Sequence, residues 1–206
     1  MAVINALIRK GIFESYEKEE KIGGAKDTAS GSSLAELTFE QGEALSQIRA
    51  QFKTHQTILL QGVTSSGKTE LYIKLISETI QQGKQVLYLL PEIALTAQMV
   101  SRLKQVFGNK VGIYHSKFSD SERIHIYRNL AGCTDQAPFH IILGVRSSLF
   151  LPYGKLGLII VDEEHEQTYK QHDPAPRYHA RDAATVLAMF AGAKVLLGSA
   201  TPSFES

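Results

Sequence analysis

The stretch that decides the fold reads Gly62-Val63-Thr64-Ser65-Ser66-Gly67-Lys68-Thr69. It follows an apolar run, residues 57–61, that predicts a strand, and it opens an amphipathic segment, residues 68–82, that predicts a helix. A glycine-rich turn in this position directs backbone N–H groups and the positive end of the helix dipole toward one point. The pattern is typical of a phosphate-binding loop, in which Lys68 reaches the β- and γ-phosphates and Thr69 contacts Mg²⁺. The alternative is a Gly/Ser turn that matches the pattern by chance, which the predicted strand before it and the predicted helix after it disfavour.

On both sides of this loop, short apolar runs alternate with longer amphipathic segments. Further candidate strands are residues 85–90, 111–114, 140–143, 157–161 and 194–197. Further candidate helices are residues 94–107, 119–130 and 179–190, the second of them capped by Ser119 or Asp120. Continuous apolar strands joined by helices predict an α/β fold of three layers around a mostly parallel sheet.

Composition narrows the class of protein. The 206 residues are 43% hydrophobic, which suits one domain with a small appendage. The lone Cys133 cannot form an internal disulfide or a thiolate zinc cluster, which excludes a disulfide-built secreted scaffold. No run approaches the roughly 20 apolar residues of a membrane span, so we expect a cytoplasmic chain. The formal net charge of +1 neither indicates nor excludes binding to nucleic acid.

A domain boundary is expected near residue 34. Residues 22–33 are rich in Gly, Ser and Ala without apolar periodicity, which predicts a linker. Residues 1–21 combine a short helical pattern with an alternating stretch and a charged end. Residues 34–206 then form the main domain.

A second motif, Asp162-Glu163-Glu164-His165, follows the apolar strand at residues 158–161. A carboxylate at the end of a buried strand is costly unless a cation pairs with it, and Mg²⁺ on a bound triphosphate would do so. Ligands of open α/β sheets bind at that edge. We therefore expect Asp162 to orient Mg²⁺ and Glu163 to act as the base that activates water. The alternative is an acidic helix N-terminus that offsets the helix dipole.

These two motifs, followed by Gly198-Ser199-Ala200-Thr201, resemble motifs I, II and III of superfamily 2 helicases in order. Further segments make the chain similar to the PriA family of primosomal helicases: residues 91–96, 115–116, 121–123, 144–147, 169–171 and 177–182. The resemblance covers residues 37–206 and implies a RecA-like P-loop NTPase fold. It further implies that residues 34–206 are the first RecA-like lobe, the helicase ATP-binding domain, and that residues 1–21 are the C-terminal remnant of a winged-helix domain.

The resemblance also implies roles for single residues. Gln41 resembles the glutamine that reads adenine, with an ordinary residue of a helix N-terminus as the alternative. Motifs Ia and Ib would contact the DNA backbone through Pro91, Thr96, Arg146 and Ser147. Val145 stands where the family usually has threonine, which puts only that hydroxyl contact in doubt.

Residues 166–178 resemble the family's aromatic-rich loop, which is implied to sense single-stranded DNA and couple it to ATP hydrolysis. Stacking faces are expected from Tyr169 and Tyr178, and phosphate contacts from Lys170, His172, Arg177 and Arg181. Residues 173–176 occupy the place of a common Gly-Trp pair, so one stacking aromatic is missing. Hydroxyl hydrogen bonds of Ser199 and Thr201 would link the hydrolysis site to DNA, and His165 would join that network. The alternatives are a solvated loop with His179 capping the next helix, and a plain strand-to-loop turn.

The implied function is an ATP-dependent 3′–5′ DNA helicase that restarts stalled replication forks in the bacterial cytoplasm, at the nucleoid. ATP and Mg²⁺ would be its cofactors, single-stranded and forked DNA its substrates, and primosome and single-strand-binding proteins its partners. The second lobe, the zinc-binding region and any arginine finger lie outside this sequence, and such an arginine is worth roughly 10³–10⁵ in rate. We therefore expect the chain to bind nucleotide, hydrolyse it slowly, leave duplex DNA intact and hold no zinc. A P-loop kinase of small molecules and a noncatalytic interaction module are the alternative functions.

Overall fold

The computed structural model describes residues 36–63, 66–92, 94, 96–115 and 118–202. The expected winged-helix remnant, residues 1–21, and the expected linker, residues 22–33, lie outside the described residues. The chain divides into two compact units, Met1–Ser30 and Gly31–Ser206, and every element below belongs to the second. No helix of the described part is long and apolar enough to cross a membrane.

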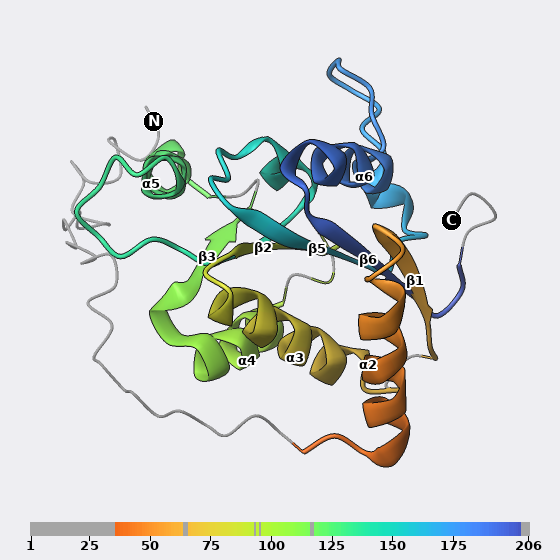
Figure 1. Ribbon diagram of the computed structural model, residues 1–206. Coiled ribbons are helices and arrows are strands. Elements are labelled where there is room, and N and C mark those ends of the chain that lie inside the picture. The colour runs from red at the N-terminus through yellow and green to blue at the C-terminus, as the bar shows by residue number, and fades with distance from the viewer. Residues whose placement is uncertain (1–35, 64–65, 93, 95, 116–117, 203–206) are drawn as a thin grey trace, which may run out of the picture. The chain divides into compact units, whose positions relative to one another are not determined.

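The described residues form one six-stranded sheet with the strand order β1-β6-β5-β2-β4-β3 (Figure 1). The strands are β1 (Thr57–Gln61), β2 (Gln85–Leu89), β3 (Val111–Tyr114), β4 (Ile141–Gly144), β5 (Leu156–Asp162) and β6 (Lys194–Ser199). All pairs are parallel, which confirms the expected sheet. Strands β4, β5 and β6 extend one or two residues beyond their predicted carboxyl ends because neighbouring strands continue the pairing there, as in Asp162 with Gly198.

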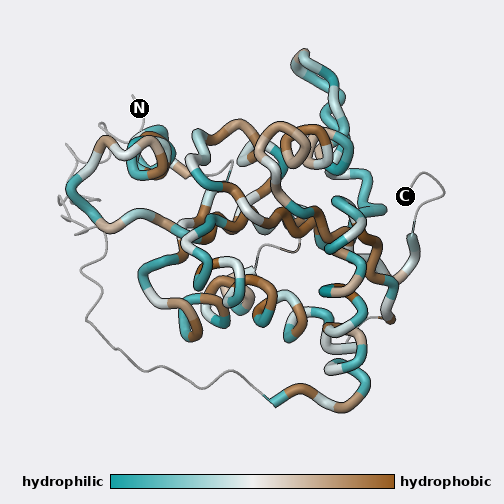
Figure 2. Tube along the Cα trace, viewed as in Figure 1, coloured by the Kyte–Doolittle hydropathy of each residue, from teal (hydrophilic) through white to brown (hydrophobic). Residues whose placement is uncertain are grey.

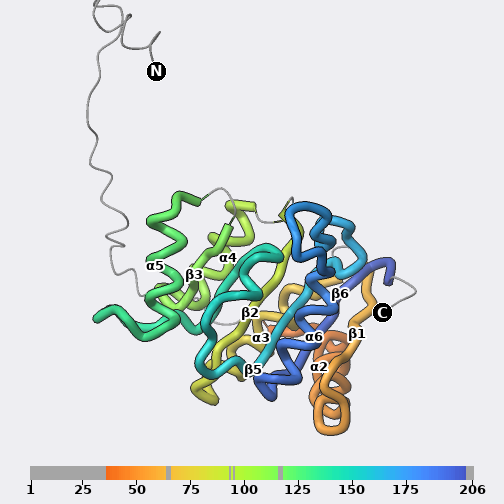
Figure 3. Tube along the Cα trace, turned by 90° about the horizontal axis from the view of Figure 1, so that it is seen from above, coloured from red at the N-terminus to blue at the C-terminus, as the bar shows by residue number. Residues whose placement is uncertain are grey.

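Helices cover both faces of this sheet. They are α2 (Phe39–Gln51), α3 (Lys68–Gln81), α4 (Ala97–Phe107), α5 (Asp120–Leu130) and α6 (Ala180–Ala191), with short 3₁₀ turns η1 (Gly108–Lys110), η2 (Arg146–Phe150) and η3 (Gln167–Tyr169). Helices α2, α3 and α4 lie on one face, and α5 and α6 on the other (Figure 1). Seen from above, α6 lies in front of the sheet and α3 behind it (Figure 3). The three expected layers are confirmed.

Side-chain caps set where several helices begin. The predicted cap Ser119 is confirmed: its side chain accepts from Glu122 N at the start of α5. Helix α4 begins at Ala97, later than predicted, because the Thr96 side chain caps it by accepting from Met99 N. His179 occupies the N-cap position of α6 without a capping side-chain hydrogen bond.

Alternate residues of the central strands pack on opposite faces of the sheet. On β2, Val86 and Tyr88 belong to the cluster beneath α3, whereas Leu87 and Leu89 belong to the cluster beneath α6. Hydrophobic colour follows the strands and the inner sides of the helices in Figure 2. Burial on both faces explains why these strands read as continuous apolar runs.

Shortening Leu143 to alanine tests the core. Leu143 of β4 is fully buried on the α3 face, so Leu143→Ala is expected to lower the free energy of unfolding by about 2–5 kcal/mol. The control Met189→Ala truncates a side chain that is 66% exposed on α6, and it is expected to change the free energy of unfolding by less than about 0.5 kcal/mol. Urea denaturation measures both, and equal losses would contradict the assignment of Leu143 to the core.

Candidate functional site

The carboxyl ends of the parallel strands gather the predicted motifs at one edge of the sheet. The glycine-rich loop follows β1, Asp162–His165 ends and follows β5, and Ser199–Thr201 ends and follows β6. Backbone hydrogen bonds join them: Gly62 N donates to Ser199 O (3.0 Å) and Glu164 N donates to Gly198 O (3.0 Å). Motifs I, II and III are therefore held side by side by main-chain bonds.

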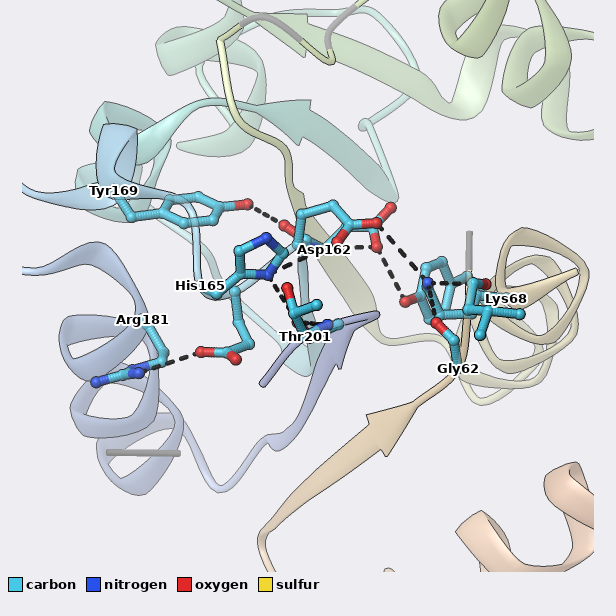
Figure 4. Close-up of polar contacts among 12 residues, drawn as sticks. Gly62, Lys68, Asp162, His165, Tyr169, Arg181 and Thr201 are labelled. Carbon is cyan, nitrogen blue, oxygen red and sulfur yellow. Dashed lines mark hydrogen bonds and ion pairs between the residues drawn. The ribbon is translucent and has the colours of Figure 1, made fainter. Parts of the chain in front are cut away.

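The glycine-rich loop leads directly into α3. Gly67, the N-cap residue, has φ +82°, a left-handed conformation that glycine adopts without steric cost. Lys68 Nζ donates to Gly62 O (2.7 Å) and lies 3.7 Å from Glu163 Oε1 (Figure 4). Thr69 is the next residue of α3, while Thr64 and Ser65 lie outside the described residues. The helix N-terminus and the Lys68 ammonium thus meet at the loop, as an anion site requires.

Gln41 lies against this loop from α2. Its side-chain Oε1 accepts from Thr38 N (2.9 Å), completing a capping box at the start of the helix. A Cβ atom added to Gly67 would collide with Gln41 Nε2, so the amide lies directly over the loop. Gln41 is therefore a residue of the helix N-terminus that also contacts the candidate nucleotide site, and its adenine-reading role stays a prediction.

Asp162 is held by three hydrogen-bond donors. Tyr72 OH donates to Oδ1, Tyr88 OH donates to Oδ2, and Glu163 N donates to Oδ1, each at 3.1 Å. Burial raises the pKa of Asp162, and the two tyrosine hydrogen bonds act in the opposite direction. Burial, followed by the charge of Asp162, raises the pKa values of Tyr72 and Tyr88 well above the usual range, so both remain donors.

Glu163, the expected base, has φ +47°, a conformation that is uncommon for residues other than glycine and that clusters at functional sites. His165 lies close to it, with Nδ1 3.8 Å from Glu163 Oε2. The same His165 Nδ1 is 2.7 Å from Ser199 Oγ, which also accepts from Thr201 N (3.1 Å). These contacts bring His165, Ser199 and Thr201 together beside the carboxylates, and Figure 4 shows His165 and Thr201 next to Asp162.

Two residues expected to contact DNA are used inside the protein instead. Tyr169 is 1% exposed, and its hydroxyl lies 2.7 Å from Asp162 O and 3.1 Å from Leu89 O, so the expectation of a stacking face is wrong. Arg181 is 8% exposed and donates to Glu164 Oε2 (3.1 Å) and Asp182 Oδ1 (2.9 Å), so the expectation of a phosphate contact is wrong. Both side chains hold the Asp162–His165 segment.

Other predicted DNA contacts remain on the surface. Lys170 and Arg177 are exposed, as is His172, whose carbonyl accepts from Arg177 Nε (3.0 Å). Lys170 and His179 form an antiparallel bridge, so the loop between them begins and ends at the same place in the structure. Thr96 is exposed at the start of α4. Pro91 is buried two residues after the end of β2, so the expectation that it contacts DNA is wrong.

Arg146 anchors a small aromatic surface in η2. Its NH1 donates to Thr168 O (2.8 Å), and its carbonyl oxygen lies 3.4 Å from Tyr178 OH. The Phe150 ring meets the Tyr178 ring edge to face, with centroids 5.2 Å apart. Phe150 is 64% exposed, and Ser147 lies half-buried in the same turn. We name Arg146, Phe150 and Tyr178 the aromatic corner.

Several residues of the site escaped sequence reasoning. Tyr72, Tyr88 and Glu164 are fully buried, and only their tertiary neighbours distinguish them from ordinary core or helix-start residues. Phe150 carries one weak signal, an aromatic residue shortly after Arg146. Gly198 belongs to motif III, and nothing in the sequence indicates that a Cβ atom there would collide with the Tyr72 hydroxyl.

The oxygen donors of the site fit Mg²⁺. Within the described residues, no group of three or more His, Cys, Asp or Glu side chains could hold a metal ion. Magnesium usually keeps several waters and takes one or two carboxylates together with phosphate oxygens. Asp162 and the hydroxyl of Thr69 are hard oxygen donors of that kind.

A parallel α/β sheet that carries a glycine-rich loop, a lysine and paired carboxylates at its carboxyl edge defines a P-loop nucleotide-binding protein. The model of the DEAD/DEAH box helicase family matches residues 38–206. The chain belongs to the DEAD/DEAH box helicase family, which disfavours the small-molecule kinase.

Two curated relatives carry the comparison further. The chain is 49% identical over 169 residues to the replication restart protein PriA of Chlamydia pneumoniae, covering 81% of this chain and 22% of that protein. It is 40% identical over 208 residues to the replication restart protein PriA of Bacillus subtilis, covering 100% of this chain and 25% of that protein. The chain therefore spans about a quarter of the length of these relatives.

Solved structures show the same fold. RecG bound to a three-way DNA junction superposes with a TM-score of 0.59 at 23% identity, covering 82% of this chain and 21% of that one. The helicase MrfA bound to DNA and AMPPNP gives a TM-score of 0.58 at 21% identity, covering 83% of this chain and 25% of that one. These likenesses confirm the RecA-like architecture.

The close approach at Gly198 gives a test of the site. Gly198→Ala places a methyl group against the Tyr72 hydroxyl and is expected to lower the free energy of unfolding by about 1–3 kcal/mol. The control Gly154→Ala adds the same methyl group to an exposed glycine with nothing within 4 Å and is expected to change stability little. Chemical denaturation compares the two, and an unaffected Gly198→Ala would contradict the packing described.

Proposed function

We propose that residues 34–206 form the ATP-binding lobe of an ATP-dependent 3′–5′ DNA helicase that acts in replication restart and primosome assembly. One observation carries the proposal. Lys68, at the N-terminus of α3, and the carboxylates of Asp162 and Glu163 converge on the glycine-rich loop, with Lys68 Nζ 3.7 Å from Glu163 Oε1. The restart role is supported by the identity of 40–49% to PriA proteins.

In this proposal each side chain of the loop and of motif II has a separate task. Residues 62–69 bind the phosphates through main-chain N–H groups, and Lys68 exchanges its bond to Gly62 O for the β- and γ-phosphate oxygens. Thr69 and Asp162 hold Mg²⁺, which when bound neutralises charge on the transferring phosphoryl group. Glu163 accepts a proton from the attacking water, and Gln41 contacts the adenine.

The DNA-binding part of the proposal uses the surface around η2. Arg146, Ser147 and Thr96 contact the DNA backbone, whereas the buried Pro91 takes no part. Single-stranded DNA then reaches residues that follow η3, namely the exposed Lys170 and Arg177 and the half-buried Tyr178. His165, Ser199 and Thr201 transmit DNA binding to the carboxylates through their hydrogen bonds, with Tyr169 and Arg181 fixing motif II.

The wider assignments belong to the same proposal. Residues 1–21 are the end of a winged-helix domain, residues 22–33 are a linker, and a second helicase lobe completes the motor. Single-stranded and forked DNA are its substrates, and primosome and single-strand-binding proteins are its partners. A protein with this role acts at the bacterial nucleoid, in the cytoplasm.

Titration of MgADP into the chain tests the nucleotide site. Lys68→Ala removes the ammonium and is expected to weaken binding about 10- to 100-fold, since a hydrogen bond to a charged group contributes about 1.5–3 kcal/mol. Lys104→Ala, which removes an exposed lysine of α4, is the control and is expected to bind like the unchanged chain. Calorimetry measures all three. Absence of binding by the unchanged chain, or equal affinity after Lys68→Ala, would favour a noncatalytic interaction module.

The aromatic corner gives a test of DNA binding. Phe150→Ala is expected to weaken binding of a single-stranded oligonucleotide about 5-fold or more, because stacking on one base contributes roughly 1–3 kcal/mol. The control Phe190→Ala removes a ring that is 88% exposed on α6. Fluorescence anisotropy of a labelled oligonucleotide measures both variants. Equal effects of the two would contradict a specific role for the corner.

A further inference from the structure

The hydrogen bonds of Asp162 leave little of its carboxylate available. An ionised carboxylate offers about four lone-pair positions. Tyr72 OH and Glu163 N use those of Oδ1, and Tyr88 OH uses one of the two on Oδ2. One acceptor position on Oδ2 remains, on a residue that is 9% exposed and lies at the carboxyl end of β5.

The two tyrosines are rigid supports. Both are 0% exposed, one on α3 and the other on β2, and their rings meet edge to face with centroids 5.6 Å apart. Gly198 leaves the space that the Tyr72 hydroxyl occupies beside Asp162. A carboxylate held from the helix and from the strand cannot rotate about its own axis without breaking two hydrogen bonds between buried groups.

We propose that Tyr72 and Tyr88 are positioning residues for Mg²⁺, which hold the Asp162 carboxylate so that Oδ2 offers a single acceptor position to the ion or to one of its waters. The inference rests on the proposed nucleotide site, and it adds that these two hydroxyl groups make the site prefer Mg²⁺. Magnesium demands near-octahedral geometry with single contacts, whereas calcium accepts flexible and bidentate carboxylates. A carboxylate locked in one orientation with one free position favours Mg²⁺ over Ca²⁺.

The alternative is that the hydroxyls serve only the stability of the fold. Buried hydrogen bonds contribute about 0.5–1.5 kcal/mol each, so loss of stability is expected under both interpretations. The dependence of nucleotide binding on the metal separates them, because a structural role leaves that dependence unchanged.

The experiment titrates free Mg²⁺, and separately Ca²⁺, against the chain in the presence of a fluorescent ADP analogue. The variants are Tyr72→Phe, Tyr88→Phe and the double variant, each of which keeps the buried ring. The matched control is Tyr153→Phe, which removes a hydroxyl that donates to Ser148 O (2.8 Å). The half-saturating metal concentration and the affinity for nucleotide in EDTA are measured for each.

The double variant is expected to raise the half-saturating Mg²⁺ concentration about 10-fold or more, the usual effect of losing residues that orient a metal ligand. Each single variant is expected to give a smaller shift in the same direction, and the singles decide the question if the double variant does not fold. The half-saturating Ca²⁺ concentration is expected to rise less, so the preference of the site for Mg²⁺ over Ca²⁺ becomes smaller. The affinity of the variants for nucleotide in EDTA is expected to stay unchanged. The Tyr153→Phe control is expected to match the unchanged chain in both measurements.

Two results would overturn the inference. Unchanged metal midpoints in the tyrosine variants would show that Asp162 needs no such support, and equal weakening with and without metal would show a structural role. Both presuppose that the unchanged chain binds nucleotide in a Mg²⁺-dependent manner. If the unchanged chain does not bind the ADP analogue at all, the proposed nucleotide site fails. If it binds the analogue equally well with and without Mg²⁺, the nucleotide site stands and this inference alone fails.

Discussion

The parallel pairing of β6 with both β1 and β5 is the constraint on which the site depends. It sets Gln61 opposite Ser199 and Asp162 opposite Gly198. The segments that follow β1, β5 and β6 therefore begin next to one another at the carboxyl edge of the sheet. Main-chain bonds from Gly62 and Glu164 to β6 extend that alignment beyond the sheet. Side chains as far apart in sequence as Lys68 and Glu163 reach each other because the backbone has already placed them.

Sequence patterns predicted most of the sheet and four of the five described helices, because apolar periodicity and the glycine-rich loop are local signals. Helix α2 escaped because only Leu45 and Ile48 of it are buried, which leaves little periodicity to detect. Tyr169 and Arg181 were misjudged because residue type says what a side chain is able to bind, while burial decides what it contacts. Tyr72 and Tyr88 looked like core residues, and only the carboxylate between them gives their hydroxyls a role.

The segment from η3 to α6 is tied to motif II at both of its ends. Tyr169 contacts the main chain of Asp162, and Arg181 pairs with the fully buried Glu164. A buried charge is costly without its partner, so this pair resists separation far more than an exposed one does. The exposed residues between these two anchors, and the half-buried Tyr178 of the aromatic corner, are thus connected to the carboxylates by contacts at each end.

The space beside Gly198 links two positions that are distant in the chain. Because the Tyr72 hydroxyl fills the volume that any side chain at position 198 would need, these residues are not free to vary independently. A lineage that replaced Tyr72 with a smaller residue would have room for alanine at position 198. A lineage that first placed alanine at position 198 would displace the Tyr72 hydroxyl and would need another hydrogen-bond donor for Asp162. Correlated substitution at positions 72 and 198 is therefore the evolutionary trace expected of this contact.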